Sequence, residues 1–249
     1  MPLREYVRCR NSESPQPLPN YPLILTIDDG HARNAQLSEA IAKTGVPVTI
    51  FLTSSIVGTT RQFWWTALQS KDDIQRLKSL PNEKRLHELA SIGFVEAASR
   101  SERQALTRDE VNAMASHVDF QAHTRFHPIL PQCDTVRARH EIQGSKEELE
   151  HNFGLHIYAL AYPNGDYSDH IIALTKQAGF SCALALHEEV NDHDTDLYKL
   201  KRITIPDDAT INELIVRASG LWGSVVRLRG KIFRGRGGGH HPQQPVGIG

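Results

Sequence analysis

Residues 23–30 read Leu23-Ile24-Leu25-Thr26-Ile27-Asp28-Asp29-Gly30, a short apolar run that ends in two adjacent acids and a glycine. The run is typical of a buried strand, and parallel α/β folds place their chemistry at strand ends. Because charged side chains are rarely buried without a partner, the two carboxylates indicate a bound cation or a proton-transfer task. A plain Asp-Asp-Gly turn would have the same sequence, so a second element is needed to decide.

A pair of histidines further along the chain is that second element. They stand in His123-Thr124-Arg125-Phe126-His127-Pro128, after a weaker strand pattern over residues 118–122. The i, i+4 spacing would put both imidazoles on one face of a helix, and a short loop could also turn both inward. Imidazole is the commonest protein ligand for zinc-like ions, and two imidazoles with one carboxylate leave a position open for water, as in catalytic zinc sites. With 13 histidines in the chain the spacing alone is weak, but beside an Asp-Asp strand end it becomes specific.

At these motifs the chain resembles the polysaccharide deacetylases, the carbohydrate esterase group with a NodB-type domain. Residues 26–30 are similar to the family's first motif, usually Thr-Phe-Asp-Asp-Gly, and residues 123–128 to its second, His-(Ser/Thr)-x-x-His-Pro. Residues 161–167, Ala-Tyr-Pro-Asn-Gly-Asp-Tyr, resemble an Ala-Tyr-Pro-(Asn/Tyr)-Gly variant of the third. The resemblance covers residues 20–206 in the family's order.

Strand and helix patterns alternate along the rest of the chain. We expect strands over 47–52, 157–162, 182–186 and 200–205, helices over 34–43, 61–90, 136–152 and 171–178, and a helix that begins with a capping box at Thr107. This alternation implies a parallel sheet, without separating a barrel from a doubly wound sheet.

The resemblance implies a distorted (β/α)7-type barrel in a single domain over residues 21–215. An extended, proline-rich N-terminal lead-in, residues 1–20, would precede this domain. A basic, partly disordered C-terminal tail, residues 216–249, would follow it.

The resemblance also implies how the motif residues divide the chemistry. Asp29, His123 and His127 would hold a divalent metal, expected to be Zn²⁺, with Co²⁺, Ni²⁺ or Mn²⁺ as alternatives. The metal would activate water and polarise the carbonyl of the substrate. Asp28 would remain free as the general base, which explains why two adjacent acids are useful.

The third motif is expected to complete the site but departs from the family pattern. The backbone after Pro163, near Asn164, would form the oxyanion site, with Tyr162 in the same substrate-contacting stretch. The arginine that orients the catalytic aspartate in the more common motif is replaced by Ala161. Arg202 is the candidate replacement, and a surface charge is the alternative reading of that residue.

Two later family motifs are not recognisable: an Asp with a following Trp, and the Leu-x-His that supplies the general acid. His31, His187 and His193 are candidate substitutes, although each is more often an ordinary polar histidine. The general acid is therefore unassigned. The aromatic pair Trp64-Trp65 is interpreted as core in preference to a sugar subsite.

Composition and charge limit the classes of function. The net charge of −1 gives no indication of nucleic-acid binding, and 39% hydrophobic with 23% charged residues is typical of a globular protein. Cys9, Cys133 and Cys182 form no readable disulfide framework, and no secretory leader or membrane-length apolar run is visible. These features predict a cytoplasmic location, with no inference about the oligomeric state.

The charge is distributed unevenly, because no acidic residue follows Glu213. Six basic residues do: Arg217, Arg227, Arg229, Lys231, Arg234 and Arg236. Interleaved with apolar residues over 214–236, they could bind the inner face of an anionic membrane as a peripheral contact. A final barrel helix followed by a solvated tail is the preferred alternative.

The sequence therefore predicts a metal-dependent hydrolase that removes N-acetyl groups from an N-acetylated glycan or glycan precursor. One alternative keeps the fold and changes the substrate to a non-sugar amide or imide. The other is a sugar-binding homologue that keeps the metal site without turnover; the missing motifs favour it, and an intact Asp28 argues against it.

Overall fold

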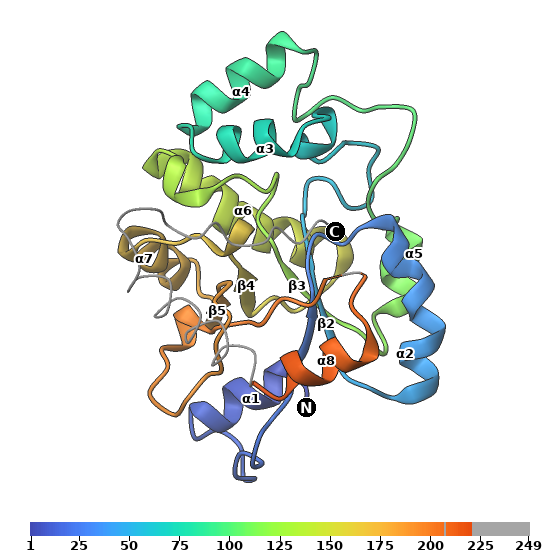
Figure 1. Cartoon of the computed structure of the whole chain (residues 1–249), viewed down its shortest axis with the longest axis vertical. Coiled ribbons are helices and arrows are strands. Elements are labelled where there is room, and N and C mark those ends of the chain that lie inside the picture. Colours follow the sequence, from blue (N-terminus) through green and yellow to red (C-terminus); the bar gives the residue numbers. More distant parts are fainter. Residues whose placement is uncertain (207, 221–249) are drawn as a thin grey trace, which may run out of the picture.

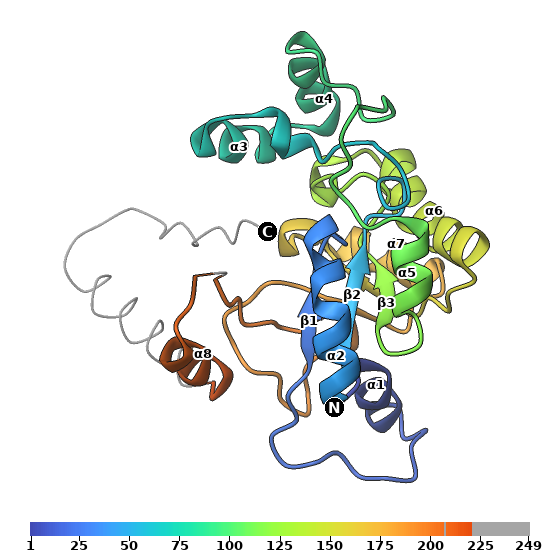
Figure 2. The same ribbon diagram turned by 90° about the vertical axis from the view of Figure 1, so that its right-hand side faces the viewer.

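The computed structural model describes residues 1–206 and 208–220. Its centre is one parallel sheet in which spatial order follows chain order (Figure 1). The strands are β1 (Leu25–Ile27), β2 (Val48–Leu52), β3 (Asp119–Ala122), β4 (Ala159–Ala161) and β5 (Cys182–Leu184). A doubly wound sheet would reverse its winding part-way across. This sheet instead curls as a half-barrel (Figure 2), so the predicted distorted (β/α) barrel in a single domain is confirmed, with five regular strands among the described residues.

Helices cover the outside of the sheet. They are α2 (Ser38–Thr44), α5 (Arg108–Met114), α6 (Thr135–Phe153) and α7 (Asp169–Gln177), with α8 (Ile211–Ala218) after the last described strand. The predicted capping box opens α5: Thr107 accepts from the Glu110 backbone N–H, and the Glu110 carboxylate accepts from the Thr107 N–H. The helix expected over 34–43 is a 3-10 turn, η1 (Ala32–Leu37), that runs into α2. The strand expected over 200–205 is reduced to a single parallel bridge from Leu200 to Leu184.

Alternate strand residues face two apolar layers. Ile50, Leu52 and Leu160 belong to the larger core, which they share with side chains of the outer helices. Phe51 and Ala159, from the opposite faces of the same strands, belong to a smaller core. Every residue of β2 is buried, as expected for a parallel strand covered on both sides.

The prediction of an extended stretch over residues 1–20 is wrong for its first half, which packs into the smaller core. Residues Leu3–Arg10 form a helix, α1, whose Leu3, Tyr6 and Val7 are buried in that core. Their i, i+3, i+4 spacing gives the helix one apolar stripe, and the inner face of the curled sheet gives that stripe a surface to cover. Residues 11–20 contain no helix or strand, as expected.

The single helix expected over 61–90 is also wrong, because the chain forms three shorter elements there. These are the 3-10 turn η2 (Trp64–Ala67), α3 (Lys71–Lys78) and α4 (Asn82–Ser91). Pro81 precedes α4 and disfavours helical backbone in the residue before it, which separates α3 from α4. We call residues 63–96 the cap; it stands at one end of the sheet and has a small core of Trp64, Leu77, Leu89 and Phe94.

All three cysteines are free thiols. Among the described residues, none of the helices has the length and apolar character required to cross a bilayer. Most of the basic segment that we considered for membrane contact lies outside the described residues.

Candidate metal centre and active site

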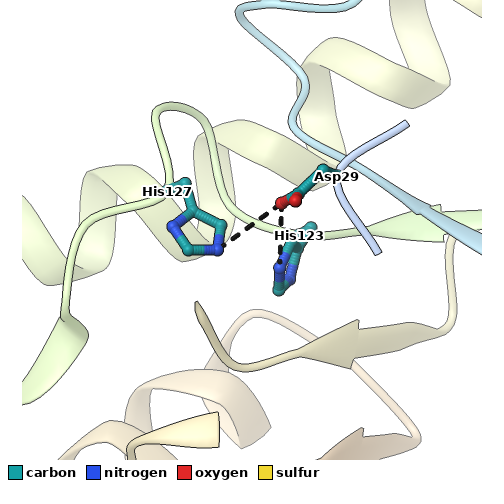
Figure 3. A group of neighbouring side chains, drawn as sticks. All are labelled: Asp29, His123 and His127. Atoms are coloured by element: carbon teal, nitrogen blue, oxygen red, sulfur yellow. Dashed lines mark ion pairs between the residues drawn. The ribbon is translucent and has the colours of Figure 1, made fainter. Parts of the chain in front are cut away.

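Asp29, His123 and His127 meet at the carboxyl ends of β1 and β3 (Figure 3). Asp29 lies two residues after β1 and His123 follows β3 directly, so the sheet itself brings these positions together. Asp29 and His127 have left-handed backbone, with φ of 72° and 56°, and such geometry in non-glycine residues is typical of constrained functional turns. Gly30 continues the first turn at φ 68°, where a Cβ would lie 2.5 Å from Leu52 Cδ2, so only glycine fits.

The three side chains present ligand atoms to one another. Asp29 Oδ1 lies 3.5 Å from His123 Nε2 and 3.5 Å from His127 Nε2. One ligand atom from each residue lies within 4.8 Å of the others. Both imidazoles are buried, so the donor set is shielded from bulk water.

The state of these groups fits a divalent cation. Asp29 Oδ1 is buried and has no hydrogen-bond partner among the described residues. His123 Nδ1 lies 2.8 Å from the Ala161 carbonyl, so it donates there and leaves the Nε2 lone pair facing Asp29. Burial lowers the pKa of His127 well below its usual value, which keeps that imidazole neutral. An unpartnered carboxylate oxygen and two imidazole rings form a donor set of the kind that zinc prefers.

The pKa values of the two adjacent acids, Asp28 and Asp29, are shifted in opposite directions. Burial raises the pKa of Asp29 to about 6, and the charge of Asp28 adds to this while His123 opposes it. Burial would also raise the pKa of Asp28, but the charge and hydrogen bonds of Arg202, together with His123, lower it to about 2. Asp28 is therefore ionised at neutral pH.

Arg202 holds Asp28 from a distant part of the chain. Its Nη1 donates to Asp28 Oδ1 at 2.6 Å and its Nη2 to Oδ2 at 2.8 Å, while its Nε donates to the Ala185 carbonyl at 3.2 Å. This bidentate pair fixes the plane of the carboxylate beside the triad, with Asp28 Oδ2 3.7 Å from His123 Nε2. Arg202 is thus in contact with the catalytic candidate and is not an isolated surface charge.

The third motif forms a tight turn, η4 (Pro163–Gly165), in which Asn164 has φ 58°. A Cβ on Gly165 would lie 2.4 Å from the Leu186 backbone nitrogen, so the turn requires glycine. Asn164 Oδ1 accepts from Lys78 Nζ at 2.7 Å, and Asn164 Nδ2 donates to Asp166 at 2.6 Å. Asn164 is therefore tied to the cap.

The side chain of Tyr162 points into the core and not towards the site. It is fully buried in the larger core, and its hydroxyl donates to the Tyr198 carbonyl at 3.1 Å. Tyr167 is the aromatic residue of this stretch that borders open space. It lines a cleft of about 430 Å³ between α3, the loop after His127 and the third motif, together with Gln75, Lys78, Ser79, Ile129, Pro131, Gln132, Asn164 and Asp166.

The cap also contacts the second motif. Trp64 belongs to the core of the cap, as expected, and its indole N–H donates to the His127 carbonyl at 3.0 Å. Trp65 places its ring edge-on to the His127 imidazole with centroids 4.5 Å apart. The aromatic pair therefore combines core packing with support of a candidate metal ligand.

Glu141 of α6 is a site residue that sequence reasoning missed. It is completely buried, and its Oε2 accepts from the backbone N–H groups of Arg125 and Phe126 at 2.8 and 2.9 Å. Its other oxygen lies 2.8 Å from Arg137, which in turn pairs with Glu96 of the cap at 2.6 Å. This carboxylate braces the loop between the two histidines. Only its place on a helix face of otherwise small or apolar residues could have indicated it.

The three histidines considered as general acids occupy other positions. His31 accepts at Nδ1 from the Arg33 backbone N–H and begins η1. His187 lies 3.3 Å from the Tyr167 hydroxyl, and His193 is almost fully exposed beside Asp194. The structure shows no contact between these three and the triad within the described part of the chain.

The sequence and the fold both match known proteins. Residues 16–183 match the family model described as "Polysaccharide deacetylase". The structure is similar to the deacetylase PplD of Streptococcus pyogenes in complex with acetate, at 18% identity, TM-score 0.63, and coverage of 88% of this chain and 78% of that chain. IcaB from Ammonifex degensii has 14% identity, TM-score 0.59, and coverage of 88% and 81%. A de-N-acetylase from Aggregatibacter actinomycetemcomitans has 15% identity, TM-score 0.56, and coverage of 87% and 82%.

No curated protein sequence matches the chain significantly. The likeness to solved structures, at these identities, supports the fold. The family match covers most of the chain and includes all three motifs. The chain therefore belongs to the polysaccharide deacetylase family, the carbohydrate de-N-acetylases among the hydrolases.

Proposed function

We propose that this protein is a metal-dependent hydrolase that removes N-acetyl groups from an N-acetylated sugar or polysaccharide. One observation carries the proposal: an unpartnered buried carboxylate oxygen lies between two imidazoles, next to a second carboxylate that an arginine keeps ionised. This arrangement offers a cation site and a base within a few ångströms of each other. Metal-assisted hydrolysis of an amide uses both.

Asp29, His123 and His127 would hold the metal, with Zn²⁺ as the first expectation and Co²⁺, Ni²⁺ or Mn²⁺ as alternatives. When bound, such a metal lowers the pKa of water and polarises a carbonyl. The hydrogen bond from His123 to the Ala161 carbonyl fixes the tautomer needed for ligation.

Asp28 would accept the proton of the attacking water. Its ionised state and its fixed carboxylate plane both follow from the bidentate contact with Arg202. Arg202 thus acts through Asp28 as a positioning residue. Asp28 and Asp29 are chemically identical, and their different surroundings assign them different tasks.

The turn at Pro163 and Asn164 would stabilise the oxyanion through its backbone. Its left-handed φ at Asn164 and its glycine at 165 give the turn one defined shape, and the hydrogen bonds of the Asn164 side chain hold it there. Tyr167 and the amides of Gln75 and Gln132 line the adjoining cleft, which suits a hydroxyl-rich substrate.

Location and membrane contact stay predictions. Helix α8 exposes Ile211 and Ile215, at 71% and 60%, next to the start of the basic segment. Two exposed apolar side chains beside basic residues support a peripheral contact with an anionic membrane surface. They are equally compatible with packing against another part of the protein.

The test is acetate release from N-acetylated chitooligosaccharides by zinc-loaded protein, beside Asp28→Asn and a chelator-treated control. Acetate release that both controls abolish is the expected result. Stoichiometric zinc binding without acetate release from these glycans or from lipid-linked N-acetylated precursors would favour a non-sugar amide or a binding role. Failure to bind any divalent metal would overturn the ligand assignment.

A further inference from the structure

Lys78 of the cap lies near the end of the sheet where the carboxyl ends of the strands meet, which we call the barrel mouth. It is the last residue of α3, and its Nζ donates to Asn164 Oδ1 at 2.7 Å, across the boundary between the cap and the third motif. Lys78 is half-buried and lines the cleft of about 430 Å³. Of the described residues around this cleft it is the only one with a positive charge.

The charges around Lys78 connect it with the candidate metal centre. The negative charges of Asp166 and Asp29 raise the pKa of Lys78. The positive charge of Lys78 in turn lowers the pKa of His127. Burial outweighs the two carboxylates and lowers the pKa of Lys78. A lysine whose pKa is lowered in this way releases its proton more readily than one in water.

The chain needs such a group because amide cleavage has a demanding leaving group. An amine leaves as a neutral molecule only when its nitrogen is protonated, and the motif that would supply the proton is not recognisable in this sequence. His31, His187 and His193 are engaged elsewhere or exposed. The Asn164 turn, the expected position of the oxyanion, is the point that Lys78 reaches.

We propose that Lys78 is the general acid, which donates a proton from Nζ to the departing amine of the substrate. This inference rests on the proposed function and adds the catalytic group that the function leaves unassigned. It also gives the cap a chemical role, because the barrel would supply the base and the metal ligands while the cap supplies the acid.

Proton transfer from Lys78 accompanies cleavage of the C–N bond. After water adds to the carbonyl carbon, the C–N bond of the tetrahedral adduct breaks, and its electron pair goes to nitrogen. That nitrogen takes the proton from Lys78 Nζ, while the oxyanion re-forms the C=O bond of acetic acid, which ionises. Asp28 releases to solvent the proton that it took from the attacking water, and neutral Lys78 regains a proton from solvent. One water is consumed, and no oxidant or reductant is needed.

The test compares two leaving groups in Lys78→Met. N-Acetylated chitooligosaccharide releases an amine that must be protonated, whereas 4-nitrophenyl acetate releases a nitrophenolate that leaves as a stable anion. We expect kcat for the amide to fall about 10²–10⁴-fold and the ester rate to stay within about threefold of the wild type. Lys71→Met, on the exposed first residue of the same helix, is the matched control and should leave both rates unchanged.

Lys78→Arg separates proton donation from simple positive charge. A guanidinium keeps the charge and gives up its proton very reluctantly, so we expect it to lose amide cleavage as the methionine variant does. Restored amide cleavage in Lys78→Arg would overturn the proposal in favour of a purely electrostatic role. Equal loss of both substrates in Lys78→Met would also overturn it, since Lys78 would then act by holding the Asn164 turn.

Failure of this inference can be told apart from failure of the proposed function. Wild-type zinc enzyme that cleaves the amide, with Lys78→Met equally active, removes Lys78 from catalysis and leaves the function intact. Wild-type zinc enzyme that cleaves neither substrate overturns the proposed function and this inference with it. Asp28→Asn should lose both substrates, which verifies that ester cleavage takes place in the same site.

Discussion

The barrel mouth and the cap build one site by different means. At the barrel mouth, Asp29 and His123 take their positions from strand ends that adjacent backbone hydrogen bonds hold in register. The cap reaches the site through side chains, with Trp64 bonding to the His127 carbonyl and Lys78 to Asn164. The two acids and His123 therefore depend on the sheet, whereas His127 also depends on the cap through its contact with Trp64.

The largest effect is expected from the base at the barrel mouth. In Asp28→Asn the side chain keeps its shape and loses its basicity, so acetate release should fall about 10²–10⁴-fold. Zinc content, measured by atomic absorption, should stay at the wild-type level because Asp28 lies outside the ligand triad. A variant that retains wild-type turnover would move the base to another residue.

The brace behind the second motif should affect metal affinity. Glu141→Ala leaves the buried N–H groups of Arg125 and Phe126 without their acceptor, and we expect zinc affinity to fall about 10–100-fold. Glu141→Gln keeps an acceptor oxygen and should lose less. Chelator-competition titrations measure both, and thermal unfolding of the metal-free proteins separates affinity from stability. Equal affinities in all three proteins would limit Glu141 to a role in folding.

A smaller effect, with a pH signature, is expected at Arg202. Arg202 lowers the pKa of Asp28, so Arg202→Met should raise it, and the base would then be protonated at pH values where the wild type is ionised. The acidic limb of kcat/KM should move to higher pH, with about a tenfold loss for each pKa unit at pH values on that limb. Arg202→Lys should fall between the two proteins. An unchanged acidic limb would show that Arg202 does not control the ionisation of Asp28.

The smallest effect on the metal centre should come from the core of the cap. Leu89 is fully buried there, and Leu89→Ala should cost about 2–5 kcal/mol of local stability. Hydrogen exchange of α3 and α4 amides should accelerate, while zinc affinity changes less than twofold (~0.4 kcal/mol). A large loss of zinc affinity would mean that cap and barrel fold as one unit and that the contrast between them is wrong.

Local sequence determined the two motifs at the centre of the site, because the residues within each motif are close neighbours in the chain. Asp28 and Asp29 end one strand, and His123 and His127 follow another. The carboxyl ends of parallel strands lie at one edge of a sheet, so the strand patterns predicted a shared edge for these groups. The family resemblance then grouped them into one metal site. The capping box at Thr107 was predictable for the same reason, because both partners lie within one turn.

Only the tertiary structure decided the contacts between distant segments. The pairing of Arg202 with Asp28 joins residues separated by 174 positions, and no local pattern distinguishes that arginine from one on the surface. The depth of Glu141, the reach of Lys78 across to Asn164 and the inward turn of Tyr162 depend in the same way on packing. Periodicity reports which face of an element is apolar; the partner of a polar side chain is set when separate elements pack together.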